Sequence, residues 1–160
     1  MMDGRTALIV EDDPTLQMAM VKRLARMGFE VASASHFEAA DSHLTARALH
    51  IACIHAHLPS RSGYELCEHI RGPLGLMDLP ILIMCQHASP GDMAYAEDVG
   101  GNAFLRKPFT MRQFADCVEF LLNARRSSAP PMRQLRPLMP PLPAAYVANR
   151  PDQRALFVAA

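Results

Sequence analysis

The sequence predicts an α/β protein in which a parallel sheet of five strands is covered by helices on both faces. Five short apolar runs alternate along the chain with five longer amphipathic stretches. The apolar runs are nearly continuous, a pattern typical of strands that are buried on both faces of a parallel sheet. Strands that alternate with helices favour a doubly wound arrangement, in which each crossover carries one helix.

The predicted elements follow one another in strict alternation. The strands are the apolar runs 6–10, 29–34, 50–54, 80–85 and 102–105. The helices are the amphipathic stretches 14–27, 37–48, 63–71, about 91–98 and 110–123. In the first helix, Asp13 fits the N-cap, Pro14 fits the first helical position and Gly28 fits the C-terminal stop. The last helix opens on "TMRQ" at residues 110–113, which is a capping-box pattern.

Charge and proline content divide the chain into two regions. Residues 1–125 carry 11 Lys/Arg and 15 Asp/Glu, a balance of −4, whereas residues 126–160 carry 5 and 1, a balance of +4. Seven of the 13 prolines and none of the glycines lie in the second region, which disfavours helix and interior strand there. We predict one folded domain over 1–125 and a flexible, proline-rich basic tail over 126–160, with a short helix from about Pro151.

Several functional classes are not expected from this composition. No apolar run is long enough to span a bilayer, and the N-terminus has no signal-peptide pattern. The four cysteines lack zinc or disulfide spacing. The tail has too few basic and aromatic residues for a nucleic-acid footprint. We therefore expect a cytoplasmic protein that binds neither membrane nor nucleic acid.

Polar side chains follow four of the five predicted strands. The acidic run Glu11–Asp13 follows the first strand, His55 the third, Cys85 ends the fourth and Lys107 follows the fifth. In an open α/β sheet, functional groups gather beyond the carboxyl ends of the strands. The sequence therefore predicts one pocket lined by an acidic pair, a histidine, a thiol and a lysine.

Four segments, "LIVEDDP", "LPSRSGYEL", "PILIMC" and "GGNAFLRKPF", resemble the response-regulator receiver domain of two-component signalling. The resemblance covers roughly residues 5–124 and implies the CheY-like, flavodoxin-like fold. It also implies an acidic pair that holds Mg²⁺, an Asp that accepts a phosphoryl group, a Thr or Ser that binds it, and a Lys. Glu11 and Asp12 match the acidic pair, Lys107 matches the lysine, and Phe104 matches the aromatic switch position.

Two positions depart from the family pattern, and both belong to its chemistry. His55 stands where the phosphoacceptor Asp is expected, and Cys85 stands for the Thr or Ser. An acyl phosphate needs a carboxylate nucleophile, Mg²⁺ prefers oxygen ligands, and a thiol is a weak hydrogen-bond donor. We therefore predict a degenerate receiver, or pseudo-receiver, that is not an enzyme and carries no cofactor, Mg²⁺ included. It would act through protein–protein contacts in bacterial two-component-type signalling.

The resemblance implies a partner surface over residues ~91–122, which would contact a kinase, an adaptor, a protease or a second copy of the chain. Three alternatives stay open. In the first, the chain is a true phosphorelay receiver with an unusual acceptor, such as Asp13 or His55. In the second, it is a metal module that uses Glu11, Asp12 and His55, with His87 nearby, or a redox module built on His55 and Cys85. In the third, a protonated His55 replaces the charge of the metal, whereas a neutral His55 would be a plain structural residue.

Overall fold

The structure, a computed structural model, describes residues 4–86, 89–126, 146–148 and 156–158. Five parallel strands form the centre of its sheet: β1 (Arg5–Val10), β2 (Phe29–Ala34), β3 (Ile51–His55), β4 (Ile81–Cys85) and β5 (Ala103–Arg106). Five helices alternate with them: α1 (Pro14–Arg26), α2 (Phe37–Ala46), α3 (Gly63–Arg71), α4 (Pro90–Asp98) and α5 (Met111–Arg126). The predicted α/β class and the order of its elements are confirmed.

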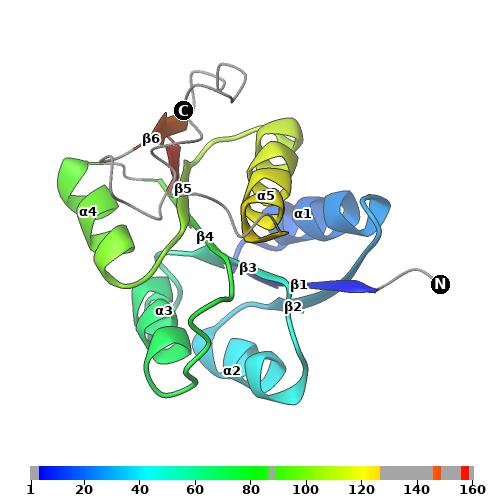
Figure 1. Cartoon of the computed structure of the whole chain (residues 1–160), viewed down its shortest axis with the longest axis horizontal. Helices are drawn as coiled ribbons and strands as arrows, with labels where there is room; N and C mark the ends of the chain where they lie inside the picture. Colours follow the sequence, from blue (N-terminus) through cyan, green and yellow to red (C-terminus); the bar gives the residue numbers. More distant parts are fainter. Residues whose placement is uncertain (1–3, 87–88, 127–145, 149–155, 159–160) are drawn as a thin grey trace.

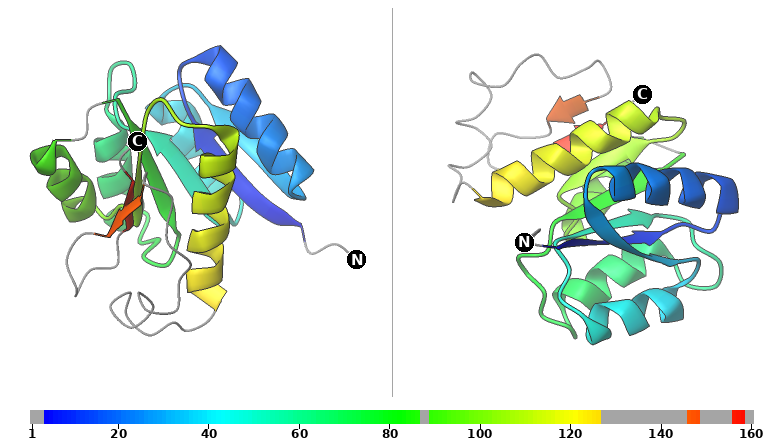
Figure 2. Two further views of the ribbon diagram at one scale, coloured as in Figure 1. Left: turned by 90° about the horizontal axis from the view of Figure 1, so that it is seen from above. Right: turned by 90° about the vertical axis from the view of Figure 1, so that its right-hand side faces the viewer.

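The five strands lie in the order β2-β1-β3-β4-β5, which is doubly wound. All four pairings between these strands are parallel. Helices α1 and α5 cover one face of the sheet, and α2, α3 and α4 cover the other, as Figures 1 and 2 show. The carboxyl ends of all five strands therefore meet at one edge, where the predicted pocket residues lie.

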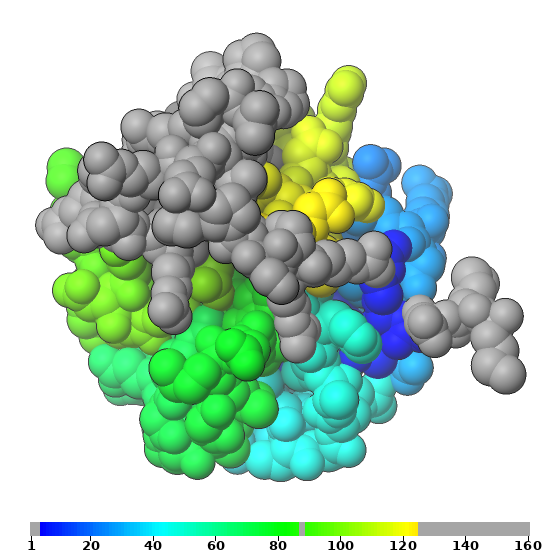
Figure 3. Space-filling view, viewed as in Figure 1, coloured from blue at the N-terminus to red at the C-terminus, as the bar shows by residue number. Residues whose placement is uncertain are grey.

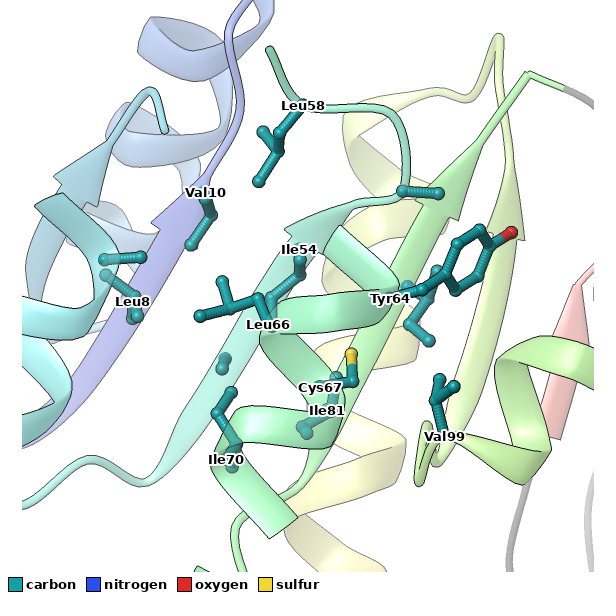
Figure 4. Close-up of a cluster of buried hydrophobic side chains, with 14 of the residues drawn as sticks. Leu8, Val10, Ile54, Leu58, Tyr64, Leu66, Cys67, Ile70, Ile81 and Val99 are labelled. Atoms are coloured by element: carbon teal, nitrogen blue, oxygen red, sulfur yellow. The ribbon is translucent and has the colours of Figure 1, made fainter. Parts of the chain in front are cut away.

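Two apolar cores hold the helices against the sheet. On one face, Met20 and Leu24 of α1 and Phe114 of α5 are fully buried against the strands. On the other, Leu66 and Ile70 of α3 point at the sheet, as Figure 4 shows. Full burial of one such side chain stabilises the fold by about 1.5–3 kcal/mol. The stripe of buried residues on each helix thus fixes where the helix lies, and with it the loop that precedes it.

The predicted N-terminal caps of α1 and α5 are confirmed. The Asp13 side chain accepts hydrogen bonds from the N–H groups of Thr15 and Leu16 at the start of α1. Thr110 and Gln113 exchange hydrogen bonds between side chain and backbone at the start of α5, which is a capping box. Helix α2 ends at Ala46, two residues before the prediction, because the backbone of Arg47 is extended.

Two further strands lie in the C-terminal region. Strand β7 (Leu156–Val158) pairs in parallel with β5, and β6 (Tyr146–Ala148) pairs antiparallel with β7. The predicted short helix from Pro151 is therefore wrong for residues 156–158. The outer edge of β5 offers unpaired N–H and C=O groups, and an apolar segment with two β-favouring residues, Phe157 and Val158, supplies their partners.

The chain segments of α2 and α3 lie together in the lower part of the space-filling view of Figure 3, with the loop that connects α3 to β4.

Among the described helices, none is long and apolar enough to cross a membrane.

Candidate functional site

The carboxyl edge of the sheet brings together four of the predicted pocket residues. Glu11 follows β1, His55 is the last residue of β3 and Lys107 follows β5. Asp12 completes the group next to Glu11. Glu11 and His55 are the two buried polar residues of the described core, with exposed fractions of 1% and 7%. Buried polar groups need partners, so their contacts define what the site can do.

Lys107 and Glu11 form a close ion pair across the sheet. The Lys107 ammonium donates to Glu11 Oε2 at 2.6 Å, and the two side chains are 10% and 0% exposed. The other carboxylate oxygen, Oε1, accepts from the backbone N–H of Asp13 at 3.1 Å. Both oxygens of Glu11 are thus in use, and the lysine charge is balanced without any carboxylate at position 55.

The His55 ring lies between the two acidic residues without touching either. Its Nδ1 is 4.0 Å from Glu11 Oε2, and its Nε2 is 3.7 Å from Asp12 Oδ1. Both separations exceed hydrogen-bond range, and the ring lies beside the backbone of Met84 in the neighbouring strand β4. Burial lowers the pKa of His55; Glu11 and Asp12 oppose this shift and Lys107 adds to it. The neutral ring is therefore favoured at neutral pH, which speaks against the predicted imidazolium.

The loop after β3 is packed tightly against the end of that strand. Gly63 opens α3, and its N–H donates to the Ala56 carbonyl at 2.8 Å. A Cβ at residue 63 would collide with the backbone carbonyl oxygen of His55 and would lie 2.8 Å from Ile54 Cγ2. Only glycine fits this approach, so α3 begins directly against His55.

Cys85 contacts the same loop through its side chain. The thiol is fully buried, and its sulfur is 3.4 Å from His57 Nε2. The sequence analysis missed this contact. Strand β3 ends at His55, so residue 57 lies in the following loop, where the alternation of a strand no longer says which way a side chain points. The predicted neighbour His87 lies outside the described residues.

Tyr64 is a second residue that sequence reasoning missed. Its ring packs against His57 and against Tyr95 of α4, with centroids 6.1 and 4.8 Å apart. Its hydroxyl is buried, and the neighbouring polar group is the Cys85 thiol, a weak hydrogen-bond partner. Burial, and then the neighbouring Cys85, raise the pKa of Tyr64. The segment "SGYEL" after the loop was the available signal, since it places an aromatic residue one position after the required glycine.

Two further predicted residues, Asp13 and Phe104, have structural roles: one caps a helix and the other packs in the core. The Asp13 carboxylate caps α1, which agrees with the capping interpretation rather than with a phosphate acceptor. Phe104 is fully buried in β5 and belongs to the apolar core on the α2–α3 face. Its ring is part of the packing, with no exposed fraction in this conformation.

The receiver resemblance implies a Mg²⁺ ion in this pocket. One ligand atom each from Glu11, Asp12 and His55 lies within 4.8 Å of the others. Mg²⁺ requires oxygen ligands in near-octahedral geometry at about 2.0–2.1 Å. Here the third donor is an imidazole nitrogen, and Lys107 already occupies one oxygen of Glu11. The imidazole nitrogen is therefore a poor ligand for Mg²⁺, whereas the carboxylates of Glu11 and Asp12 are oxygen ligands of the kind that Mg²⁺ takes.

Proteins with similar sequences include bacterial regulators. The chain is 28% identical over 121 residues to the transcriptional regulatory protein GltR of Pseudomonas aeruginosa, covering 76% of this chain and 50% of GltR. It is 26% identical over 118 residues to the chemotaxis protein CheY1 of Helicobacter pylori, covering 72% of this chain and 95% of CheY1. The chain thus spans about half the length of GltR and nearly all of CheY1.

Solved structures agree on the fold. A CheY-like receiver domain protein from Methanospirillum hungatei superposes with a TM-score of 0.71 at 21% identity, covering 79% of this chain and all of that one. A two-component response regulator from Clostridium difficile gives 0.71 at 21% identity, covering 77% and 99%. The family profile of the response regulator receiver domain matches residues 7–119. The chain therefore belongs to the response regulator receiver domain family.

Proposed function

We propose that this receiver acts in two-component-type signal transduction by phosphorylation-independent protein–protein contact. The observation that carries the proposal is the buried ion pair between Lys107 and Glu11, at 2.6 Å. Glu11 balances the charge of Lys107, and the neutral imidazole of His55 stands in the place of the acceptor carboxylate. Without a carboxylate at residue 55, no acyl phosphate forms there. Receiver domains are generally signalling modules and not enzymes, and the proposal keeps this chain in that class.

The proposed partner surface is formed by α4, β5 and α5, over residues ~91–122. Tyr95 is 47% exposed on α4, a large aromatic side chain of the kind that anchors protein interfaces. Asp98 on α4 is exposed, as are Arg106 and Arg112 on the neighbouring elements, so the surface carries both signs of charge. Charges of both signs suit a signalling partner or a second copy of the chain. Because β7 pairs with the β5 edge, the helix side chains are the available part of this surface.

Phosphoryl uptake tests the proposal. The full chain is incubated with Mg²⁺ and a small acyl-phosphate donor, and the mass of the intact protein is measured over time. We expect no phosphorylated species from the wild type. The matched variant His55→Asp restores a carboxylate at the strand end and is expected to take up one acid-stable, base-labile phosphoryl group. Uptake by the wild type that disappears in Asp12→Asn or Lys107→Met would contradict the proposal.

A second candidate is a phosphorelay receiver with an unusual acceptor. The specific observation in its favour is that Glu11, Asp12 and Lys107 still converge on one pocket. The same experiment separates the two functions, because a phosphorelay receiver must acquire the phosphoryl mass without any substitution at His55. Peptide mapping of that species would identify the acceptor side chain.

A further inference from the structure

We propose that the outer edge of β5 is a binding site for an extended apolar segment of a partner protein, and that β7 fills this site as a displaceable internal ligand. Three residue pairs form the parallel contact: Ala103 with Leu156, Phe104 with Phe157 and Leu105 with Val158. Figures 1 and 2 show this contact between α4 and α5. The inference rests on the proposed function in one respect, since it takes β5 as part of the partner surface.

Strand β5 would be the last strand of the sheet without this contact. The sheet runs in the order β2-β1-β3-β4-β5-β7-β6, and β4 pairs with the inner side of β5. The outer side of such a strand presents N–H and C=O groups that need partners. Sheet edges of this kind bind extended peptides by strand addition, in which backbone hydrogen bonds supply affinity and alternate side chains supply specificity. The β5 edge therefore has the backbone chemistry of a peptide-binding site.

The sequence that fills the edge indicates which peptides suit it. All three residues of β7, Leu156–Val158, are apolar, and two of them favour strands. On the β5 side, Phe104 belongs to the core under α2 and α3, whereas Ala103 and Leu105 belong to the core under α1 and α5. A strand added at β5 therefore continues a sheet that is apolar on both faces. We expect the site to take an uncharged, apolar segment and to reject an acidic or basic one.

The contact of β7 is short compared with the pairings inside the sheet. It joins three residue pairs, and so does the pairing of β6 with β7, whereas six pairs join β1 and β2. Parallel pairing is slightly less stable per residue than antiparallel pairing, and a two-stranded hairpin is marginally stable by itself. The strands β6 and β7 therefore belong among the elements that open locally before the sheet as a whole does.

The covalent attachment of β7 keeps the site closed until a partner competes for it. Residues 127–145 join α5 to β6 and hold six of the 13 prolines. A short tether gives the attached segment an effective concentration on the order of 1 mM. A partner segment must therefore bind the edge well enough to overcome this local competition, which makes β7 a threshold for partner binding.

The first test compares the full chain with its variant Phe157→Pro. Because β7 pairs with a strand on each side, a proline in its middle removes a ladder hydrogen bond whichever side the N–H faces. The matched control is Ala160→Pro, which lies beyond β7. Amide hydrogen exchange is followed by NMR. Among residues 103–106, we expect the amides that face β7 to exchange at least about tenfold faster in Phe157→Pro, with no change in the β3 amides or in the control.

The second test opens the site to a peptide in trans. A synthetic peptide with the sequence of residues 144–160 is titrated to about 1 mM into the isotope-labelled full chain. We expect it to shift the β5 amides of Phe157→Pro saturably. Binding to the wild type and to Ala160→Pro should be at least about tenfold weaker, because their own β7 competes. The same peptide with Phe157→Pro in its sequence should shift none of these amides.

Three results would overturn the inference: equal exchange of the β5 amides in the wild type and Phe157→Pro, no saturable shift in Phe157→Pro, or equal peptide affinity for the two chains. If Phe157→Pro fails to fold by circular dichroism, Val158→Pro decides, since that residue also lies in β7. Neither readout uses a phosphodonor. Phosphoryl uptake by the wild type would therefore refute the proposed function, whereas these results would refute the peptide site alone.

Discussion

Removing the lysine of the central ion pair is expected to destabilise the protein strongly. Lys107→Met leaves the Glu11 carboxylate buried, with 0% exposure and a single remaining backbone donor. Breaking a buried pair by deleting one partner costs about 3–5 kcal/mol. Because the Lys107 side chain is still 10% exposed, we place the expectation near the lower end, at about 3 kcal/mol. The unfolding free energy is measured by urea titration at pH 7.

A double-mutant cycle separates the pair from the loss of packing. Glu11→Gln together with Lys107→Met leaves no buried charge in the pair, so we expect a coupling energy of about 2 kcal/mol. The matched control is the surface pair Arg47–Glu30, at 2.9 Å with side chains 39% and 67% exposed. Its coupling should be below about 1 kcal/mol. Equal coupling in the two pairs would refute the view that the Lys107–Glu11 pair is a buried structural bond.

Three further predictions concern the neighbours of this pair. Because burial lowers the pKa of His55, the unfolded chain binds a proton at this residue more readily than the folded chain does. The unfolding free energy should therefore fall as the pH drops below about 6.5. Urea titrations at pH 7.5 and 5.5 should show a smaller fall in His55→Gln than in the wild type. Tyr64→Phe removes a buried hydroxyl whose hydrogen-bond partner is the Cys85 thiol, a weak one, so the unfolding free energy should fall by less than about 1 kcal/mol. Gly63→Ala forces a methyl against the His55 carbonyl and should cost about 2 kcal/mol or more in the same titration.

Each of these predictions has a result that would contradict it. If the unfolding free energy of His55→Gln depends on pH as that of the wild type does, another group causes the loss of stability at low pH. A loss well above about 1 kcal/mol in Tyr64→Phe would show that the hydroxyl makes a stronger hydrogen bond than one to a thiol. For the glycine, Gly91→Ala in α4 is the control, since its added Cβ would have only the Ser89 hydroxyl within 4 Å, at 3.7 Å. Equal costs for the two glycines would contradict the steric argument.

Much of the fold could be predicted because its signals are local. The five strands are buried on both faces and therefore read as apolar runs. The caps at Asp13 and Thr110 lie within four residues of the groups they bond. Strands β6 and β7 were missed, since a three-residue strand has no periodicity of its own and depends on the free edge of β5.

The sequence predicted which residues form the candidate site, but not which of them contact one another. The sequence identified Glu11, Asp12, His55 and Lys107, because all follow predicted strands. It could not assign their pairing, because the Lys107–Glu11 bond joins residues 96 positions apart. The contact between His57 and Cys85 was missed for another reason, since strand alternation does not extend into a loop.

The central claim is that His55 has ended the phosphoacceptor role of this pocket. The most direct test is a two-dimensional amide NMR spectrum of the full chain with and without Mg²⁺ and beryllofluoride, which mimics a phosphorylated carboxylate. We predict that the amides of Lys107 and Phe104 keep their positions in the wild type and shift in His55→Asp. Saturable shifts of those amides in the wild type would show that the pocket still holds an acceptor, and would contradict the claim.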